Sequence, residues 1–129
     1  MRIVQCLGAT RKEIEARKFN IWVGISLGNK YFTKENIREY VLWALENTRE
    51  DVLVVIADRL YAIKLEILDK YNKLRAFNVA FRYGDKKEHE VREIILELPE
   101  EKRKLIKIAR FRQITDTKYY EARLEILRE

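Results

Sequence analysis

A serine at the end of an apolar stretch is the first residue in this sequence whose type and place could do chemistry. Ser26 closes the run 21–26 and is followed by a polar loop before any helix begins. Strand side chains alternate between faces, so Trp22, Gly24 and Ser26 share one face. Glycine has no side chain, which leaves open space beside the hydroxyl. A small group could therefore sit there, against the main chain.

The chemistry open to this serine is nucleophilic attack. A serine hydroxyl is a weak nucleophile unless its proton is accepted and the developing oxyanion is stabilised. The backbone N–H groups of residues 27–29 are candidate oxyanion donors, whereas the sequence indicates no resident base. The simpler alternative is that Ser26 only turns the chain, with Asn29 as a left-handed turn residue and Tyr31 and Phe32 packing beneath the loop.

Other residues are candidates for a substrate pocket next to Ser26. Trp22 would line the pocket or fill it, and Val54 and Ile56, on the next predicted strand, are weaker candidates. Ligands of an open α/β sheet bind beyond the carboxyl ends of its strands. This rule places Asp58, which follows that second strand, at the same edge as the serine.

A second motif overlaps the first, because residues 24–28 also match Gly-x-Ser-x-Gly, the nucleophile elbow of α/β-hydrolases. The chain order permits a triad of Ser26, Asp58 and His89. In an elbow, however, a helix begins directly after the serine, and here the expected cap is Thr33. The charged residues around His89 indicate a solvated helix face. A serine hydrolase is therefore the weaker alternative.

Length and composition limit the possible architectures. A chain of 129 residues with 47% apolar content supports a single domain, 1–129. The net charge of +6 favours an anionic partner, although weakly. The single cysteine and the absence of a run of about 20 apolar residues predict a cytoplasmic protein without a structural disulfide or a membrane span. Without nucleotide-binding glycine motifs or paired Cys and His, we expect neither a cofactor nor a metal.

The elements needed to position the serine alternate along the chain. Strands are expected at 3–7, 21–26, 51–57 and 105–111, and helices at 10–18, 33–47, 58–71, 72–84, 85–98 and from Thr115 or Asp116 onward. This order predicts a Rossmann-like α/β fold, with a mostly parallel sheet and helices on both faces. The strand 21–26 is apolar on both faces and should be covered on both sides. Gly84 is expected to end one helix and Asp85 to start the next.

The residues around the serine resemble a known family, the tRNA-dependent cyclodipeptide synthases. Its hallmark is a strand ending Gly-x-Ser-x-x-Asn followed shortly by Tyr-Phe, which Gly24, Ser26, Asn29, Tyr31 and Phe32 match. The resemblance continues through most of the chain to an Arg-aromatic-x-x-Ile stretch at 110–114. It implies a fold similar to the catalytic domain of class I tyrosine and tryptophan tRNA synthetases, without their ATP-binding signatures.

The resemblance also implies an activity. Ser26 would take an aminoacyl group from one aminoacyl-tRNA and pass it to the amine of a second, and the dipeptide would then cyclise. Gly24 and Asn29 would be further catalytic residues, and Tyr31 would belong to the substrate pocket. The family's Tyr-x-x-x-Glu pair on a later helix has no counterpart near the C-terminus. We therefore expect a domain that is truncated at the C-terminus relative to the family and impaired in releasing product. We also expect a homodimer that covers the exposed apolar surface.

A basic stretch is the candidate surface for tRNA, since the family also places basic helix residues there. It comprises Lys73, Arg75, Arg82, Lys86 and Lys87. Arg75, Arg82 and Lys86 would share one face if the helix continues past Gly84, and such residues would contact phosphates without reading sequence. Two alternatives stay open: a solvated helix face without a function, and a non-catalytic tRNA- or RNA-binding module.

Overall fold

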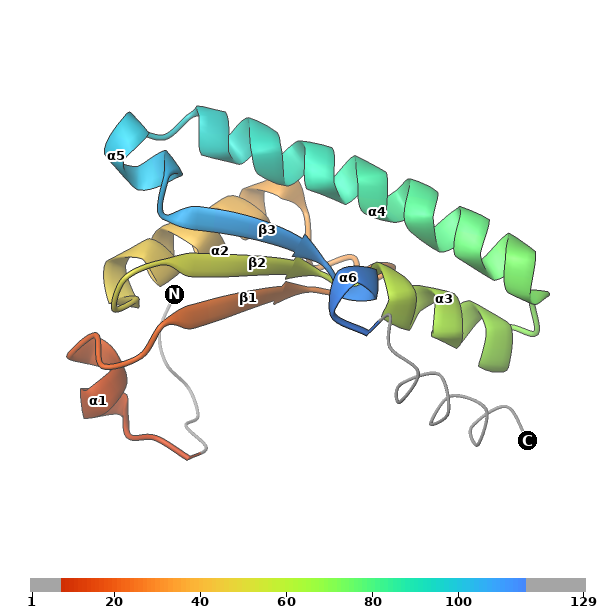
Figure 1. Ribbon diagram of the computed structural model, residues 1–129, viewed down its shortest axis with the longest axis horizontal. Coiled ribbons are helices and arrows are strands. Elements are labelled where there is room, and N and C mark those ends of the chain that lie inside the picture. Colours follow the sequence, from red (N-terminus) through yellow and green to blue (C-terminus); the bar gives the residue numbers. More distant parts are fainter. Residues whose placement is uncertain (1–7, 116–129) are drawn as a thin grey trace.

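The computed structural model describes residues 8–115 as strands that alternate with helices (Figure 1). In chain order the elements are α1 (Arg11–Glu15), β1 (Ile21–Ile25), α2 (Lys34–Asn47), β2 (Val52–Ile56), α3 (Asp58–Ile67), α4 (Lys73–Leu96), α5 (Glu100–Arg103), β3 (Ile106–Arg110) and α6 (Phe111–Thr115). The predicted strand 3–7 and the predicted last helix beyond residue 115 lie outside the described residues.

The described strands form one parallel sheet in the order β1-β2-β3. Gly24 of β1 is in register with Val55 of β2, which is in register with Ala109 of β3. The carboxyl ends of the strands therefore meet at one edge, where α3 and α6 begin (Figure 1). The predicted Rossmann-like α/β fold with a parallel sheet is confirmed.

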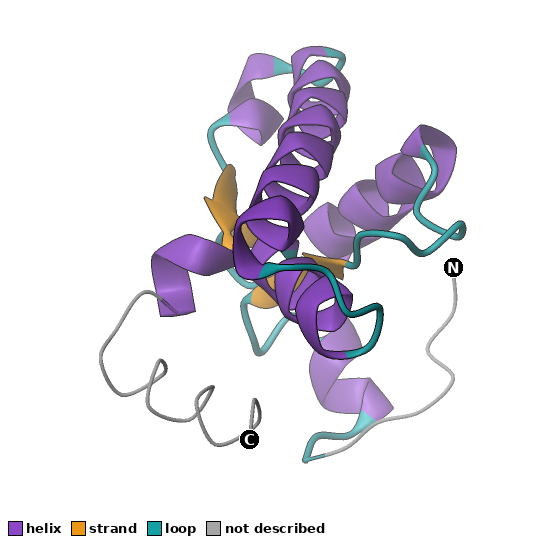
Figure 2. Cartoon of the chain, turned by 90° about the vertical axis from the view of Figure 1, so that its right-hand side faces the viewer, coloured by secondary structure: helices purple, strands orange, loops and turns teal. Residues whose placement is uncertain are grey.

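The hydrophobic core lies between one face of this sheet and the helices α2 and α4, which pack on the same side of the strands (Figure 2). Alternate strand residues supply the sheet side of the core, and helix residues at 3–4 spacing supply the other side. The buried members include Val23, Ile25, Val52, Val54 and Ile106 from the strands, with Ile37, Val41, Ala44, Leu45, Val91 and Ile94 from the helices. Packing of α2 and α4 on this face holds the strand ends in place.

The opposite face of β1 is open among the described residues. Trp22 is 67% exposed, and Gly24 is exposed as well. Within residues 8–115, the prediction that this strand is covered on both sides is therefore not met. An apolar run indicates that a strand can be buried on both faces, but it does not show that a neighbouring element reaches the second face.

The predicted caps of α1 and α2 are confirmed. Thr10 and Glu13 form a capping box at the start of α1, and this short helix ends at Glu15 rather than at residue 18. The Thr33 side chain accepts a hydrogen bond from the Asn36 N–H at the start of α2. The loop before α2 thus has a fixed end, which limits where the residues after Ser26 can lie.

Helix α4 is longer than predicted, because Gly84 does not end it. Asn72 caps its start, as expected, and the helix then runs without interruption through Gly84 to Leu96. Gly84 is buried, and an added Cβ would clash with the Arg110 guanidinium and lie 3.1 Å from the Asp58 Cβ. Glycine is needed here for close packing against β3 and α3, not for a left-handed C-terminal turn.

Two helix faces and the boundary between β3 and α6 differ from expectation. The buried residues of α3 include Ala62 and Leu65, whereas Leu60 of the predicted apolar stripe is 47% exposed. Leu74 of α4, predicted to face inward, is also exposed. Strand β3 ends at Arg110 and a helix begins at once at Phe111, before the predicted cap. The first two errors placed an apolar residue in the core although it is exposed.

Candidate active site

Ser26 lies directly after β1, exposed at the carboxyl edge of the sheet. The loop that follows is tightly folded. Gly28 has a φ of +79°, and an added Cβ there would lie 2.7 Å from the Tyr61 ring, so only glycine fits without strain. The Asn29 Oδ1 accepts a hydrogen bond of 2.9 Å from the Tyr31 N–H, which closes a local turn. Asn29 therefore shapes the serine loop.

A pocket of about 300 Å³ opens beside Ser26 on the uncovered face of the sheet. We call it the apolar pocket. Its lining residues are Trp22, Gly24, Ile25, Ser26, Val55, Ala57, Leu60 and Phe111. At Gly24 an added Cβ would meet nothing within 4 Å, so the space expected from the sequence is open. The structure thus brings Trp22, Gly24 and Ser26 together, as strand alternation predicted.

Val54 and Ile56 do not line this pocket. Both are fully buried in the core on the other face of β2. The register pairs Gly24 with Val55, so the residue of β2 that shares the face of Ser26 is Val55. The prediction had the wrong parity, because an all-apolar strand gives no alternation from which to assign its faces.

A second, smaller pocket also adjoins Ser26. It has a volume of about 130 Å³ and is called here the lysine pocket. Its lining residues are Ser26, Leu27, Ala57, Leu60, Tyr61 and Lys64. The two pockets share Ser26, Ala57 and Leu60, so they meet at the serine. No sequence motif or spacing singles out Lys64, which lies two turns into α3.

Asp58 lies at the predicted edge but does not line either described pocket. It is fully buried and its Oδ2 accepts a hydrogen bond of 2.8 Å from Nε of Arg110. Its Oδ1 accepts from the backbone N–H of Arg59 at 2.7 Å and of Arg112 at 3.1 Å. Both carboxylate oxygens thus form hydrogen bonds that join the starts of α3 and α6 to the end of β3.

Arg110 extends this buried network to α4. Its Nη1 lies 2.6 Å from Asp85, and its Nη2 donates to the Phe81 carbonyl at 3.1 Å. Burial lowers the pKa of Arg110, but the hydrogen bond to Asp85 and the charge of Asp58 outweigh burial and raise the pKa above its usual range. Because Phe111 follows directly, the network fixes the residue that closes one side of the apolar pocket.

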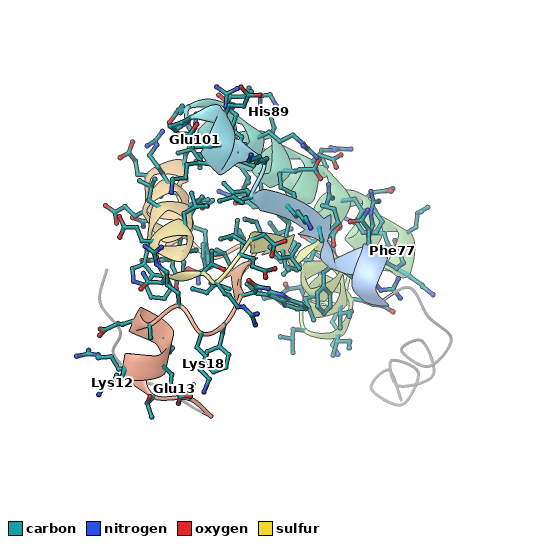
Figure 3. All side chains as sticks on the ribbon, turned by 60° about the vertical axis from the view of Figure 1, so that its left-hand side comes forward. Lys12, Glu13, Lys18, Phe77, His89 and Glu101 are labelled. Carbon is teal, nitrogen blue, oxygen red and sulfur yellow. The ribbon has the colours of Figure 1, made fainter. Side chains whose placement is uncertain are left out.

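The structure does not assemble the triad of a serine hydrolase. His89 is 77% exposed in its side chain and pairs with Glu93, with Nε2 and Oε1 3.2 Å apart. In Figure 3 His89 projects outward from α4. Since Asp58 is bound to Arg110, neither partner is available to Ser26. In addition, no helix begins directly after the serine, because α2 starts at Lys34.

Tyr31 is half-exposed and lines neither pocket. Its ring makes edge contacts with Phe32, at 5.4 Å between centroids, and with Tyr40 of α2, at 6.3 Å. These contacts match the expectation that the aromatic pair packs beneath the loop. Tyr31 thus supports the loop that carries the serine.

Four of the five candidate tRNA-binding residues are exposed on α4, namely Lys73, Arg75, Arg82 and Lys86. Lys87 differs from them, because it is buried and its Nζ donates to the Phe32 carbonyl at 2.6 Å. It also pairs with Glu90 at 3.1 Å. Lys87 therefore anchors the serine loop to α4 and does not lie on the exposed basic face.

Within residues 8–115, no group of His, Cys, Asp or Glu has the arrangement of a metal site. In the same residues, no helix is long and apolar enough to span a bilayer.

A family model described as cyclodipeptide synthase matches residues 3–129. The chain belongs to the cyclodipeptide synthase family. This membership agrees with the residues around Ser26 that suggested it.

Solved structures with the same fold include members of this family. A Mycobacterium tuberculosis protein, described as showing that cyclodipeptide synthetases are related to type I tRNA synthetases, has a TM-score of 0.66 at 21% identity, over 86% of this chain and 47% of its own. A cyclodipeptide synthase from Streptomyces noursei has a TM-score of 0.63 at 21% identity, over 81% and 48%. A cyclo(L-leucyl-L-phenylalanyl) synthase has a TM-score of 0.66 at 22% identity, over 86% of this chain and 48% of its own.

At these identities the likeness shows the fold. The chain spans about half the length of these solved relatives. Among curated proteins no match is found.

Proposed function

We propose that this protein performs the acyl transfer of a cyclodipeptide synthase, with Ser26 as the nucleophile. The observation that carries the proposal is the exposed serine at the carboxyl edge of the sheet, beside an open pocket of about 300 Å³. Acyl transfer needs a nucleophile that a substrate can reach and a space that holds the acyl side chain. Both are present at this edge, in a chain of the cyclodipeptide synthase family.

The proposed reaction has two transfers. In the first, the serine Oγ bonds to the carbonyl carbon of an aminoacyl-tRNA, the ester bond to the ribose oxygen breaks, and the serine proton ends on that oxygen. In the second, the amine of another aminoacyl-tRNA attacks the acyl-serine and releases the hydroxyl. Attack by the free amine on the remaining ester then closes the cyclic dipeptide and releases the second tRNA, whose ribose oxygen takes the amine's proton. The backbone N–H groups after Ser26 are candidate donors to the oxyanion.

The lining of the apolar pocket favours a first amino acid with a large apolar side chain. Trp22, Val55, Leu60 and Phe111 offer apolar and aromatic surface, and Gly24 adds no side chain of its own. A charged side chain would lose its water here without gaining a charged partner from these residues, which is costly. One solved relative is named for leucyl and phenylalanyl groups, which are of this class.

The test is the intact mass of the protein after incubation with a panel of charged tRNAs. Ser26 is the only serine in the sequence, so a serine ester has a single possible location. We expect an added aminoacyl mass with apolar amino acids, and no such mass in Ser26→Ala. The chain also has a single cysteine, and Cys6→Ala serves as the control for a thioester. The adduct should persist in that variant.

Two results would contradict the proposal: an adduct that remains in Ser26→Ala, or no adduct across the whole panel. The second result, combined with salt-dependent binding of tRNA, would favour a non-catalytic tRNA-binding module. The exposed basic residues of α4 are the observation behind that alternative.

A further inference from the structure

The two pockets at Ser26 differ in chemistry. The apolar pocket has an aromatic and aliphatic lining, whereas the lysine pocket ends at Tyr61 and Lys64 of α3. Ser26, Ala57 and Leu60 line both pockets, and the other lining residues differ. A group bonded to the Ser26 hydroxyl could therefore extend in two directions, one apolar and one cationic.

Acyl transfer needs two directions of this kind. When Oγ attacks an ester, the carbonyl carbon becomes tetrahedral, and the acyl group and the leaving oxygen are separate substituents that each need space. If the apolar pocket holds the side chain, the leaving group extends toward the other pocket. In the proposed function this leaving group is the terminal ribose of a tRNA, which carries a phosphate.

Lys64 is suited to such a group. Its side chain is exposed and lines the lysine pocket. Its Nζ lies 5.7 Å from the centre of the Tyr61 ring, so a cation and an aromatic face occupy one small pocket. Lysine binds phosphate as a point charge, and an aromatic ring offers a surface for a sugar or a base.

We propose that the lysine pocket, about 130 Å³ in volume, receives part of the terminal nucleotide of the donor aminoacyl-tRNA, with Lys64 contacting its phosphate. This inference rests on the proposed function for the identity of the donor. Lys64 is then a positioning residue, which acts on the nucleotide part of the substrate and not on the serine. Its effect should appear only with donors that carry a nucleotide.

The test compares two donors of the same aminoacyl group: the charged tRNA and a small activated ester without a nucleotide. The second-order rate constant for acylation of Ser26 is measured by mass for both donors. Lys64→Ala should lower the rate constant for the charged tRNA about tenfold, the loss expected for one charge-assisted contact, and leave the small ester unchanged. Lys102→Ala on α5, with the same loss of charge, should change neither.

A second measurement does not depend on serine chemistry. Binding of adenosine 5′-monophosphate and of adenosine is followed through the NMR signals of the Tyr61 ring. The wild type should bind the monophosphate more tightly, and Lys64→Ala should bind both equally. If neither donor acylates Ser26, the proposed function fails, but this comparison still decides whether Lys64 recognises a phosphate.

Two outcomes would overturn the inference. An equal loss with both donors would mean that Lys64 acts on the serine itself. Equal binding of adenosine and its monophosphate by the wild type would mean that the pocket does not recognise a phosphate.

Discussion

Two glycines of this chain show how the same residue type can serve packing in one place and access in another. At Gly84 the backbone of α4 comes close to Arg110 and Asp58, so a side chain would meet a buried ion pair. At Gly24 an added Cβ would meet nothing within 4 Å, and the missing side chain leaves the apolar pocket open. The first glycine allows close packing, and the second leaves the apolar pocket open.

We expect Gly84→Ala to destabilise the protein. Alanine gains about 1 kcal/mol over glycine in a helix. Its Cβ, however, would push the Arg110 guanidinium away from Asp58 and Asp85, and overpacking of this kind costs about 1–3 kcal/mol. Because Arg110 is buried and held on several sides, the clash should outweigh the helix preference. Urea unfolding should therefore show a lower midpoint with an unchanged slope.

The matched control is Gly24→Ala, which adds the same methyl group in open space. Its midpoint should equal or exceed that of the wild type, because glycine weakens a strand. A midpoint for Gly84→Ala at or above that of the wild type would show that Arg110 yields easily, and the ion-pair argument would then be wrong.

At the residue scale the sequence predicted which side chains lie together where a spacing rule applied. Alternation along β1 correctly placed Trp22, Gly24 and Ser26 together. It could not decide between Val54 and Val55, because both strand faces are apolar. Lys87 reads as a surface charge by type, and only the structure shows its Nζ bonded to the Phe32 carbonyl.

At the scale of elements, the uninterrupted helix α4 fulfils a condition that the sequence left open. Arg82 and Lys86 lie 7 and 11 positions after Arg75. On one continuous helix the three residues therefore share a face. All three are exposed. This face is about three turns long and therefore suits the repeated phosphates of a nucleic-acid backbone.

We expect the triple variant Arg75→Ala, Arg82→Ala, Lys86→Ala to bind tRNA more weakly than the wild type. The slope of log K against log salt should fall by about one for each lost phosphate contact. The three side chains are exposed, so the melting temperature should change little. Fluorescence anisotropy with labelled tRNA at several salt concentrations measures both the affinity and the slope.

A control for net charge is the variant Lys12→Ala, Lys102→Ala, Lys104→Ala, which also removes three exposed cations but from α1 and the α5 region. Its binding should change much less. An equal loss of affinity in both variants would point to a general effect of charge. An unchanged binding isotherm in the α4 variant would mean that this face of α4 is only solvated and does not bind tRNA.

Element prediction succeeded where the signals were local and failed where they were not. The caps at Thr10, Thr33 and Asn72 are local hydrogen bonds, and the structure confirms them. Gly84 gave the local signal of a helix end, but the side chain that makes it necessary comes from β3, more than twenty residues away. A distant cause of this kind leaves no trace in the neighbouring sequence.

At the scale of the molecule, the parallel fold and the edge with the candidate site were predictable. The buried ion pair that joins the elements at this edge was not. The sequence placed Asp58 at that edge as a pocket residue. Instead, its carboxylate joins α3, α6 and β3 through Arg110, 52 residues away. A buried ion pair of such separation depends on the assembled sheet, and neither charge shows by its type that it will be buried.

The open face of the sheet leads to the last prediction, that the protein self-associates through the rim of the apolar pocket. Trp22 is 67% exposed and Leu60 47% exposed, and both line that pocket. Exposed apolar patches of this kind tend to bind partners, and a central tryptophan often dominates such contacts. We expect the average mass in sedimentation experiments to rise toward a dimer with concentration. Trp22→Ser should raise the dissociation constant by about tenfold or more.

Leu96→Ser is the matched control for this prediction, because Leu96 is exposed to the same extent, at 68%, but lies at the last residue of α4. It should leave the dissociation constant unchanged. An equal effect of both substitutions would place the contact elsewhere, and a wild type that stays monomeric at high concentration would contradict self-association. Since Trp22 also lines the apolar pocket, a dimer built on this rim would cover the site, and acylation of Ser26 should then slow as the protein concentration rises.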